Sequence, residues 1–128
     1  ISACLVGSEM CIRDRVMVEQ QLRRLLNNLS EATKAQDEAY GRFLDAKRAL
    51  DFAEAAEFVE TVGKGSVKDR EALVALATVH DREACDVADR AYRYARSRLE
   101  MLKIQIMGVQ TIGKSVSTAY GAVGVVES

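Results

Sequence analysis

The absence of proline constrains this chain most, because proline is the residue that most reliably interrupts a helix. The sequence has 128 residues, 48% of them hydrophobic, and no proline. A chain of this length would ordinarily contain about six. We therefore expect long uninterrupted helices, and the length allows one small domain.

A heptad repeat predicts the first long helix. Spacings of four and three alternate along a series that is apolar or small except at Gln36: Val18, Leu22, Leu25, Leu29, Ala32, Gln36, Ala39, Phe43, Ala46, Leu50 and Ala53. This 3.5-residue repeat is typical of a coiled-coil seam, the stripe that faces a neighbouring helix. The repeat predicts a helix over about 18–60.

Residues 61–66 predict a turn. Gly63 and Gly65 can take the left-handed conformation that closes a helix, and Ser66 is a good N-cap. A second helix should follow over about 67–120, and the glycines at 108 and 113 leave open whether it bends there. Its expected seam is Leu73, Leu76, His80, Ala84, Val87, Ala91, Tyr94 or Ala95, Arg98 or Leu99, Leu102, Ile106 and Val109.

A short turn between two long helices predicts an all-α fold, a long antiparallel and coiled-coil-like hairpin. A turn centred near residue 64 would place Phe43 near Cys85 and Leu22 near Ile106. Large apolar residues remain on the flanks of both helices: Leu26, Tyr40, Phe52, Phe58, Ile104 and Ile112. They predict a homo-oligomer, most simply a dimeric four-helix bundle.

The first fifteen residues are not expected to belong to the protein. The string CLVGSEMCIRD, Cys4 to Asp14, closely resembles a translated sequencing-adapter tail of the kind found in metagenomic gene models. The alternative is a genuine disordered arm. Residues 16–128 then form the expected domain, with Cys85 as its one cysteine. A lone cysteine cannot form an internal disulfide, so we expect the cytoplasm of the host bacterium.

Signals for catalysis are weak, and we expect a non-enzymatic protein without cofactor or metal. His80 is the only histidine and has no ligand set at metal-binding spacing, so a core histidine is the better interpretation. Cys85 is expected to be small buried packing. The row Asp51, Glu54, Glu57 and Glu60 is interpreted as a solvated face. The chain has 18 basic and 19 acidic residues, and this balance argues against a duplex-DNA binder.

The segment 90–98 contains four arginines and two tyrosines in nine residues. Arginine can bind phosphate through two hydrogen bonds, and tyrosine can stack on a base. Helical-wheel angles place Tyr94, Arg98 and Gln105 at or beside the seam. Arg90 and Arg93 flank it, and Gln36 of the first helix lies across the hairpin. The candidate ligand-binding residues are therefore Arg98, Tyr94, Arg93, Arg90, Gln36 and Gln105.

Two interpretations of this polar set stay open. It could line a pocket between the helices for a small anionic, nucleotide-like ligand. Alternatively, it could be structural and fix the register of the seam. Arg98 would then pair with Glu31 across the hairpin, and Arg90 or Arg93 with Asp37 or Glu38. Single-stranded nucleic acid is a weaker possibility, because the net charge is −1 and acidic faces would repel a long phosphate backbone.

Two motifs resemble small two-helix phage proteins that have no assigned chemistry. The first is G-S-V-x-x-R-x-A, here Gly65 to Ala72, and the second is the closing Gln110-Thr111-Ile112. The resemblance covers about 53–120 and transfers no catalytic residue. It implies a phage product that acts inside a bacterium.

These observations predict a phage-type binding protein that captures, and so sequesters, a small nucleotide-like signal in counter-defence. One alternative is an inhibitor or scaffold that binds a host protein through its coiled-coil surface. Another is an accessory single-stranded-DNA-binding protein of recombination. None of the three involves a membrane.

Overall fold

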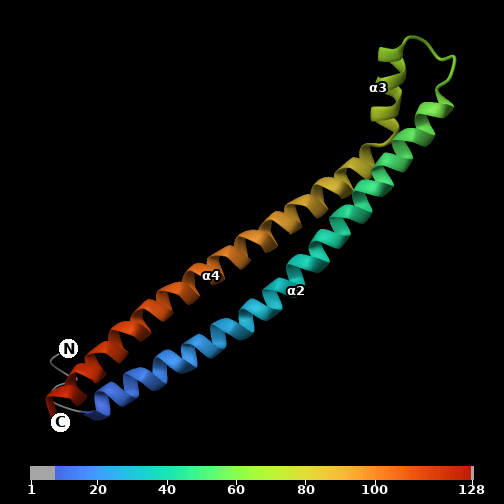
Figure 1. The fold of residues 1–128 in the computed structure, drawn as a ribbon. Helices are drawn as coiled ribbons and strands as arrows, with labels where there is room; N and C mark the ends of the chain where they lie inside the picture. The colour runs from blue at the N-terminus through green and yellow to red at the C-terminus, as the bar shows by residue number, and fades with distance from the viewer. Residues whose placement is uncertain (1–7, 128) are drawn as a thin grey trace. The chain divides into compact units, whose positions relative to one another are not determined.

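The part of the chain that the structure describes is almost entirely helical. The structure is a computed structural model, and it describes residues 8–127. Figure 1 shows its three helices: α2 (Ser8–Glu60), α3 (Val67–Ala77) and α4 (Val79–Glu127). No strand occurs within these residues. The predicted all-α class is confirmed, with a long helix packed against another.

The first helix ends where the heptad repeat predicts, but it begins earlier. It starts at Ser8 instead of Val18, so it includes residues 8–15 of the expected non-native tail. Residues 1–7 of that tail lie outside the described residues. All eleven predicted seam positions of this helix, Gln36 included, are buried or half-buried.

The turn forms as predicted. Gly63 and Gly65 have φ values of 80° and 95°, in the left-handed region that favours glycine. Ser66 caps α3, because its side chain accepts a hydrogen bond from the backbone N–H of Asp69. The Asp69 carboxylate accepts one from the Ser66 backbone N–H in return, which completes a capping box.

The prediction of one uninterrupted helix over 67–120 is wrong, because the helix is interrupted at Thr78. This residue is fully buried and non-helical, with φ −108° and ψ 17°. Its hydroxyl and its backbone N–H both donate to the carbonyl oxygen of Val74, at 2.8 and 3.0 Å. Such back-bonding by threonine often bends a helix. By contrast, α4 continues through Gly108 and Gly113 and beyond residue 120.

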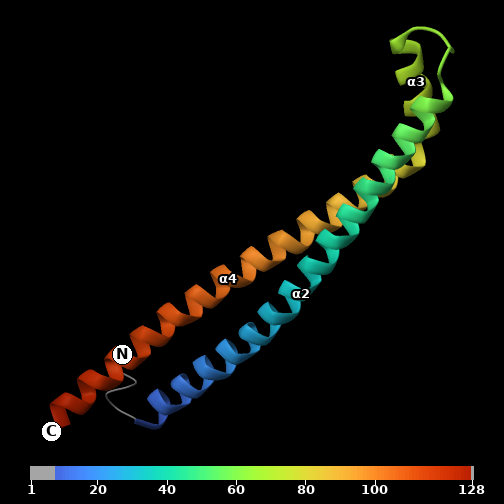
Figure 2. The ribbon, with the colours of Figure 1, turned by 45° about the vertical axis from the view of Figure 1, so that its right-hand side comes forward.

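The described residues form two compact units, each built from antiparallel helical segments. The terminal unit contains residues 8–33 of α2 and 98–127 of α4. The turn unit contains residues 34–97, and Figures 1 and 2 agree that α3 lies beside the end of α2 there. Both long helices run through both units. The division was not predicted from the sequence.

The terminal unit has a compact apolar core. Ala32, Leu99 and Leu102 form a buried cluster, against which Leu25 and Leu29 pack. Ile106 and Val109 of α4 are buried as well. Further along, a Cβ added to Gly113 would lie 3.2 Å from Cγ1 of Val18, so the two helices approach closely there.

The second seam is predicted correctly only in its later part. Leu99, Leu102, Ile106 and Val109 are buried, but every predicted position from Leu73 to Ala91 is exposed. The seam of α4 instead passes through half-buried positions one residue further along: Cys85, Ala88, Tyr92 and Ala95. Alanines occur on both sides of this segment, so the apolar pattern does not fix its phase.

The register differs from the one expected from the turn alone. The Phe43 ring stacks on Tyr92, with centroids 6.3 Å apart, and not near Cys85. Leu22 lines a shallow hollow with Val109. The prediction assumed that one helix leaves the turn, whereas α3 is a separate helix that ends before α4 begins.

Candidate functional site

The six predicted ligand-binding residues are divided between the two units. The turn unit contains four of them: Gln36, Arg90, Arg93 and Tyr94. The terminal unit contains the other two, Arg98 and Gln105. Only Gln36 is half-buried; the others are exposed, Tyr94 by 72%. The helical wheel placed Tyr94, Arg98 and Gln105 at or beside the seam, and all three are exposed. Where the pattern left Tyr94 or Ala95 and Arg98 or Leu99 open, burial selects Ala95 and Leu99.

The aromatic residue that packs between the helices is Tyr92, which is not among the predicted seam positions. Its ring centroid lies 5.0 Å from that of Tyr40, at an interplanar angle of 49°. The Tyr92 ring is nearly parallel to the Phe43 ring, with an interplanar angle of 9°. The signal was present in the sequence, because Tyr92 stands one heptad before Leu99. Its ring contacts explain it as a packing residue.

The arginines of the 90–98 segment have carboxylates close by. Arg93 Nε lies 3.2 Å from the Asp89 carboxylate on the same helix, and Glu38 pairs with Arg42. The predicted pairing of Arg93 across the hairpin is therefore wrong. Arg90 borders an open hollow of about 480 Å³ whose other lining residues are Glu83, Asp86 and Val87. Two carboxylates beside one arginine favour a cation over a phosphate.

His80 and Cys85 lie in different environments. The His80 side chain is 98% exposed, so its interpretation as a core histidine is wrong. Its Nδ1 lies 3.9 Å from a Glu83 carboxylate oxygen. Cys85 is half-buried, with a free thiol. Within residues 8–127, no cluster of three or more potential ligands could hold a metal ion.

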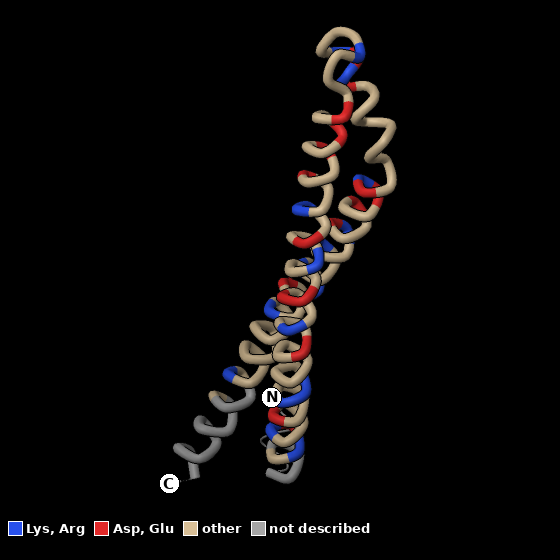
Figure 3. The backbone as a smooth tube through the Cα atoms, turned by 90° about the vertical axis from the view of Figure 1, so that its right-hand side faces the viewer, with Lys and Arg blue, Asp and Glu red and all other residues tan. Residues whose placement is uncertain are grey.

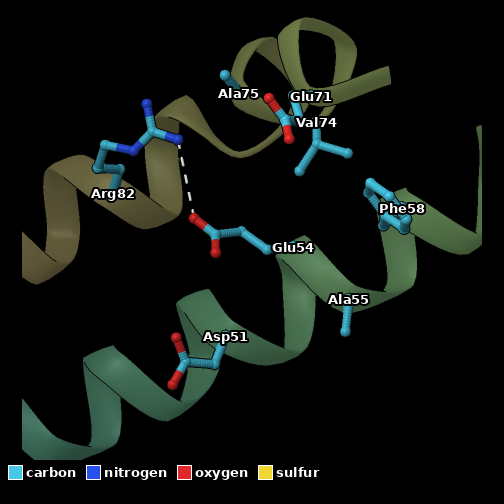
Figure 4. A pocket seen from close by; sticks show the side chains of 8 residues that line it. All are labelled: Asp51, Glu54, Ala55, Phe58, Glu71, Val74, Ala75 and Arg82. Atoms are coloured by element: carbon cyan, nitrogen blue, oxygen red, sulfur yellow. Dashed lines mark ion pairs between the residues drawn. The ribbon is translucent and has the colours of Figure 1, made fainter. Parts of the chain in front are cut away.

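A second hollow of the turn unit lies between α2, α3 and the start of α4 (Figure 4). Its volume is about 570 Å³. Alanines and two larger apolar side chains line it together with three carboxylates and one arginine: Asp51, Glu54, Ala55, Phe58, Glu71, Val74, Ala75 and Arg82. Arg82 pairs with Glu54 at 3.8 Å, and both side chains remain partly exposed.

Arg70 fixes the α2 side of this hollow. Its guanidinium donates to the Phe58 carbonyl oxygen at 2.9 Å and to the Thr61 hydroxyl at 3.3 Å. The same group lies 4.1 Å above the Phe58 ring, in a cation–π contact. Because the contacts join α3 to the last turn of α2, they hold the turn unit closed at its tip.

A different kind of surface occurs on α4 in the terminal unit. Residues 104–113, IQIMGVQTIG, contain no charged side chain, whereas basic and acidic residues are interspersed along most of the chain (Figure 3). On the side away from the core, five exposed residues form a stripe that we call the α4 outer face: Met101, Ile104, Gly108, Thr111 and Ile112.

The α4 outer face is apolar for a surface in contact with water. Met101, Ile104 and Ile112 are 61%, 69% and 56% exposed. Thr111 donates its hydroxyl to the Met107 carbonyl oxygen at 2.9 Å, so that polar group is already satisfied within α4. The sequence had marked Ile104 and Ile112 as exposed apolar residues, and this prediction is confirmed.

Comparisons with protein-family models, with curated proteins and with solved structures found no match for this chain. The resemblance to phage proteins therefore stays a prediction.

The two surfaces differ in what they could bind. The hollow between α2, α3 and the start of α4 has apolar lining residues, but its charged ones are three carboxylates and one arginine that is already paired. The α4 outer face has no charge to desolvate, and depletion of charge is typical of the centre of protein interfaces. In addition, no helix within residues 8–127 is long and apolar enough to cross a bilayer.

Proposed function

We propose that this chain is a protein-binding module that contacts its partner helix to helix, through the α4 outer face. The observation that supports this is the ten-residue stretch without charge, on which large apolar side chains stay exposed. An amphipathic surface helix ordinarily places charged residues opposite its buried stripe. The α4 outer face instead resembles a second buried stripe that lacks its neighbour.

Energetics favour covering this face. Full burial of an isoleucine or methionine side chain stabilises by about 1.5–3 kcal/mol. Three such side chains are more than half exposed. A partner that covers them gains several kcal/mol before the cost of association, and meets no charged group at the centre of the contact.

Capture of an anionic ligand has less support in this geometry. Arg98 and Tyr94 are exposed, and Arg93 is paired with Asp89. The hollow that Arg90 borders is lined by two carboxylates. Binding through the coiled-coil surface, the alternative predicted from the sequence, is therefore the function that the described residues favour.

A charge placed in the α4 outer face tests the proposal. We expect Ile112→Asp to lose the proteins that co-purify with the unaltered chain from its host, because an aspartate in an apolar contact must be desolvated. Val87→Asp is the matched control, since Val87 is an exposed apolar residue of α4 in the other unit. Circular dichroism should show equal helicity for all three proteins. If Ile112→Asp and the unaltered chain retain the same partners, this face is not the binding surface.

A further inference from the structure

The partner that best fits the α4 outer face is a second copy of the same face. We propose that two copies of this chain associate through their α4 outer faces, antiparallel, and cross at Gly108. The inference rests on the proposed function and names the partner of that surface. It follows from the symmetry of the face, from the space at its centre and from its charge.

The face is symmetric about its central glycine. Ile104 and Ile112 lie four residues before and four residues after Gly108. In an antiparallel pair with a two-fold axis at Gly108, each Ile104 meets Ile112 of the second copy, and the glycines meet each other. The contact between Ile104 and Ile112 is then made twice, once on each side of the axis, as a self-complementary two-fold interface requires.

The centre of the face has room for a close crossing. A Cβ built on Gly108 would find no heavy atom of the described chain within 4 Å. The distance between packed helices depends on the side chains at their contact. With glycine on both sides, the two backbones can approach until the flanking isoleucines interlock.

The lack of charge on the α4 outer face is compatible with a second copy of the chain. Identical faces present identical charges, so a face with a net charge repels its own copy. Residues 104–113 have none. The nearest lysines, Lys103 and Lys114, lie more than a quarter turn from the centre of the face at roughly 100° per residue, so they point away from the second copy.

The size of the face predicts a reversible pair. From Met101 to Ile112 the helix extends about 18 Å. A standard interface buries about 800 Å² on each partner, which one face of this length does not reach. The dimer should therefore dissociate on dilution, and its population should rise with protein concentration.

Disulfide trapping tests both the contact and its direction. The full chain is used with its cysteines at 4, 11 and 85 replaced by serine. In the proposed pair, a cysteine at 108 meets its own copy, so Gly108→Cys should give a disulfide-linked dimer under mild oxidation. Two cysteines at 104 would lie about 12 Å apart along the helices, too far for a disulfide, and the same holds at 112.

The mixed experiment is the sharper one, because it leaves Gly108 intact. An equimolar mixture of Ile104→Cys and Ile112→Cys chains should give linked heterodimers at least tenfold in excess of either homodimer. Val87→Cys serves as the control for random collision and should stay monomeric on a non-reducing gel. Equal linking of every single-cysteine variant with itself would overturn the antiparallel arrangement.

Sedimentation of the unaltered chain provides the second measurement. We expect a monomer–dimer equilibrium that Ile112→Asp weakens at least tenfold and Val87→Asp leaves unchanged. A monomer at every concentration, with no linking in the mixture, would overturn self-association. The proposed function is judged separately, by whether Ile112→Asp loses host partners. If the unaltered chain is monomeric and Ile112→Asp nevertheless loses the host partners, another protein occupies the face and the self-association proposal is wrong.

Discussion

Single residues decide how the turn closes, and the two glycines of 61–66 differ in what limits them. Both have positive φ. A Cβ on Gly63 would meet no described atom within 4 Å, whereas one on Gly65 would lie 2.8 Å from an Asp69 carboxylate oxygen. That oxygen accepts the hydrogen bond from the Ser66 N–H. Gly65 therefore supports the cap as well as the backbone conformation.

This difference gives a prediction for a matched pair of substitutions. Gly63→Ala should lower the free energy of unfolding by about 1 kcal/mol, the strain of a left-handed alanine. Gly65→Ala should lower it by about 2 kcal/mol or more, because the capping box must also shift. Urea denaturation followed by circular dichroism measures both. Equal losses would mean that the capping box contributes nothing to stability.

At the scale of elements, we expect the break between α3 and α4 to depend on the buried hydroxyl of Thr78. We expect Thr78→Val, which keeps the shape and removes the donor to Val74, to shift residues 77–79 toward helical geometry. Thr78→Ser keeps the hydroxyl and should keep the break. Backbone chemical shifts distinguish the two variants. A break that persists unchanged in Thr78→Val would assign it to packing around the residue.

The elements also show how far sequence reasoning reaches. The heptad of the first helix and the glycines of the turn have direct local causes, and both were predictable. The phase of the second seam was not predictable, because Thr78 interrupts the helix and alanines occur on both sides of the seam. The pattern therefore left Tyr94 or Ala95 and Arg98 or Leu99 as alternatives, and only the burial of Ala95 and Leu99 in the structure decides between them.

At the scale of the whole molecule, burial is unevenly distributed between the two units. Among the residues whose burial the structure describes, seven apolar residues are buried, and five of them belong to the terminal unit: Ala32, Leu99, Leu102, Ile106 and Val109. In the turn unit, Ala39 and Val74 are the other two, and Tyr92 is half-buried. Local opening requires less free energy where fewer apolar contacts must be broken. The two units should therefore differ in local stability although both consist of paired helices.

Amide hydrogen exchange measures this difference directly. We expect amides of residues 99–109 to exchange at least tenfold more slowly than those of residues 81–92 of the same helix. Dimerisation could also protect the terminal unit, so the comparison is repeated on Ile112→Asp at low concentration. Slow exchange that persists there comes from the core around Leu99 and Leu102. Exchange at equal rates in the variant would mean that the terminal unit owes its stability to the second copy.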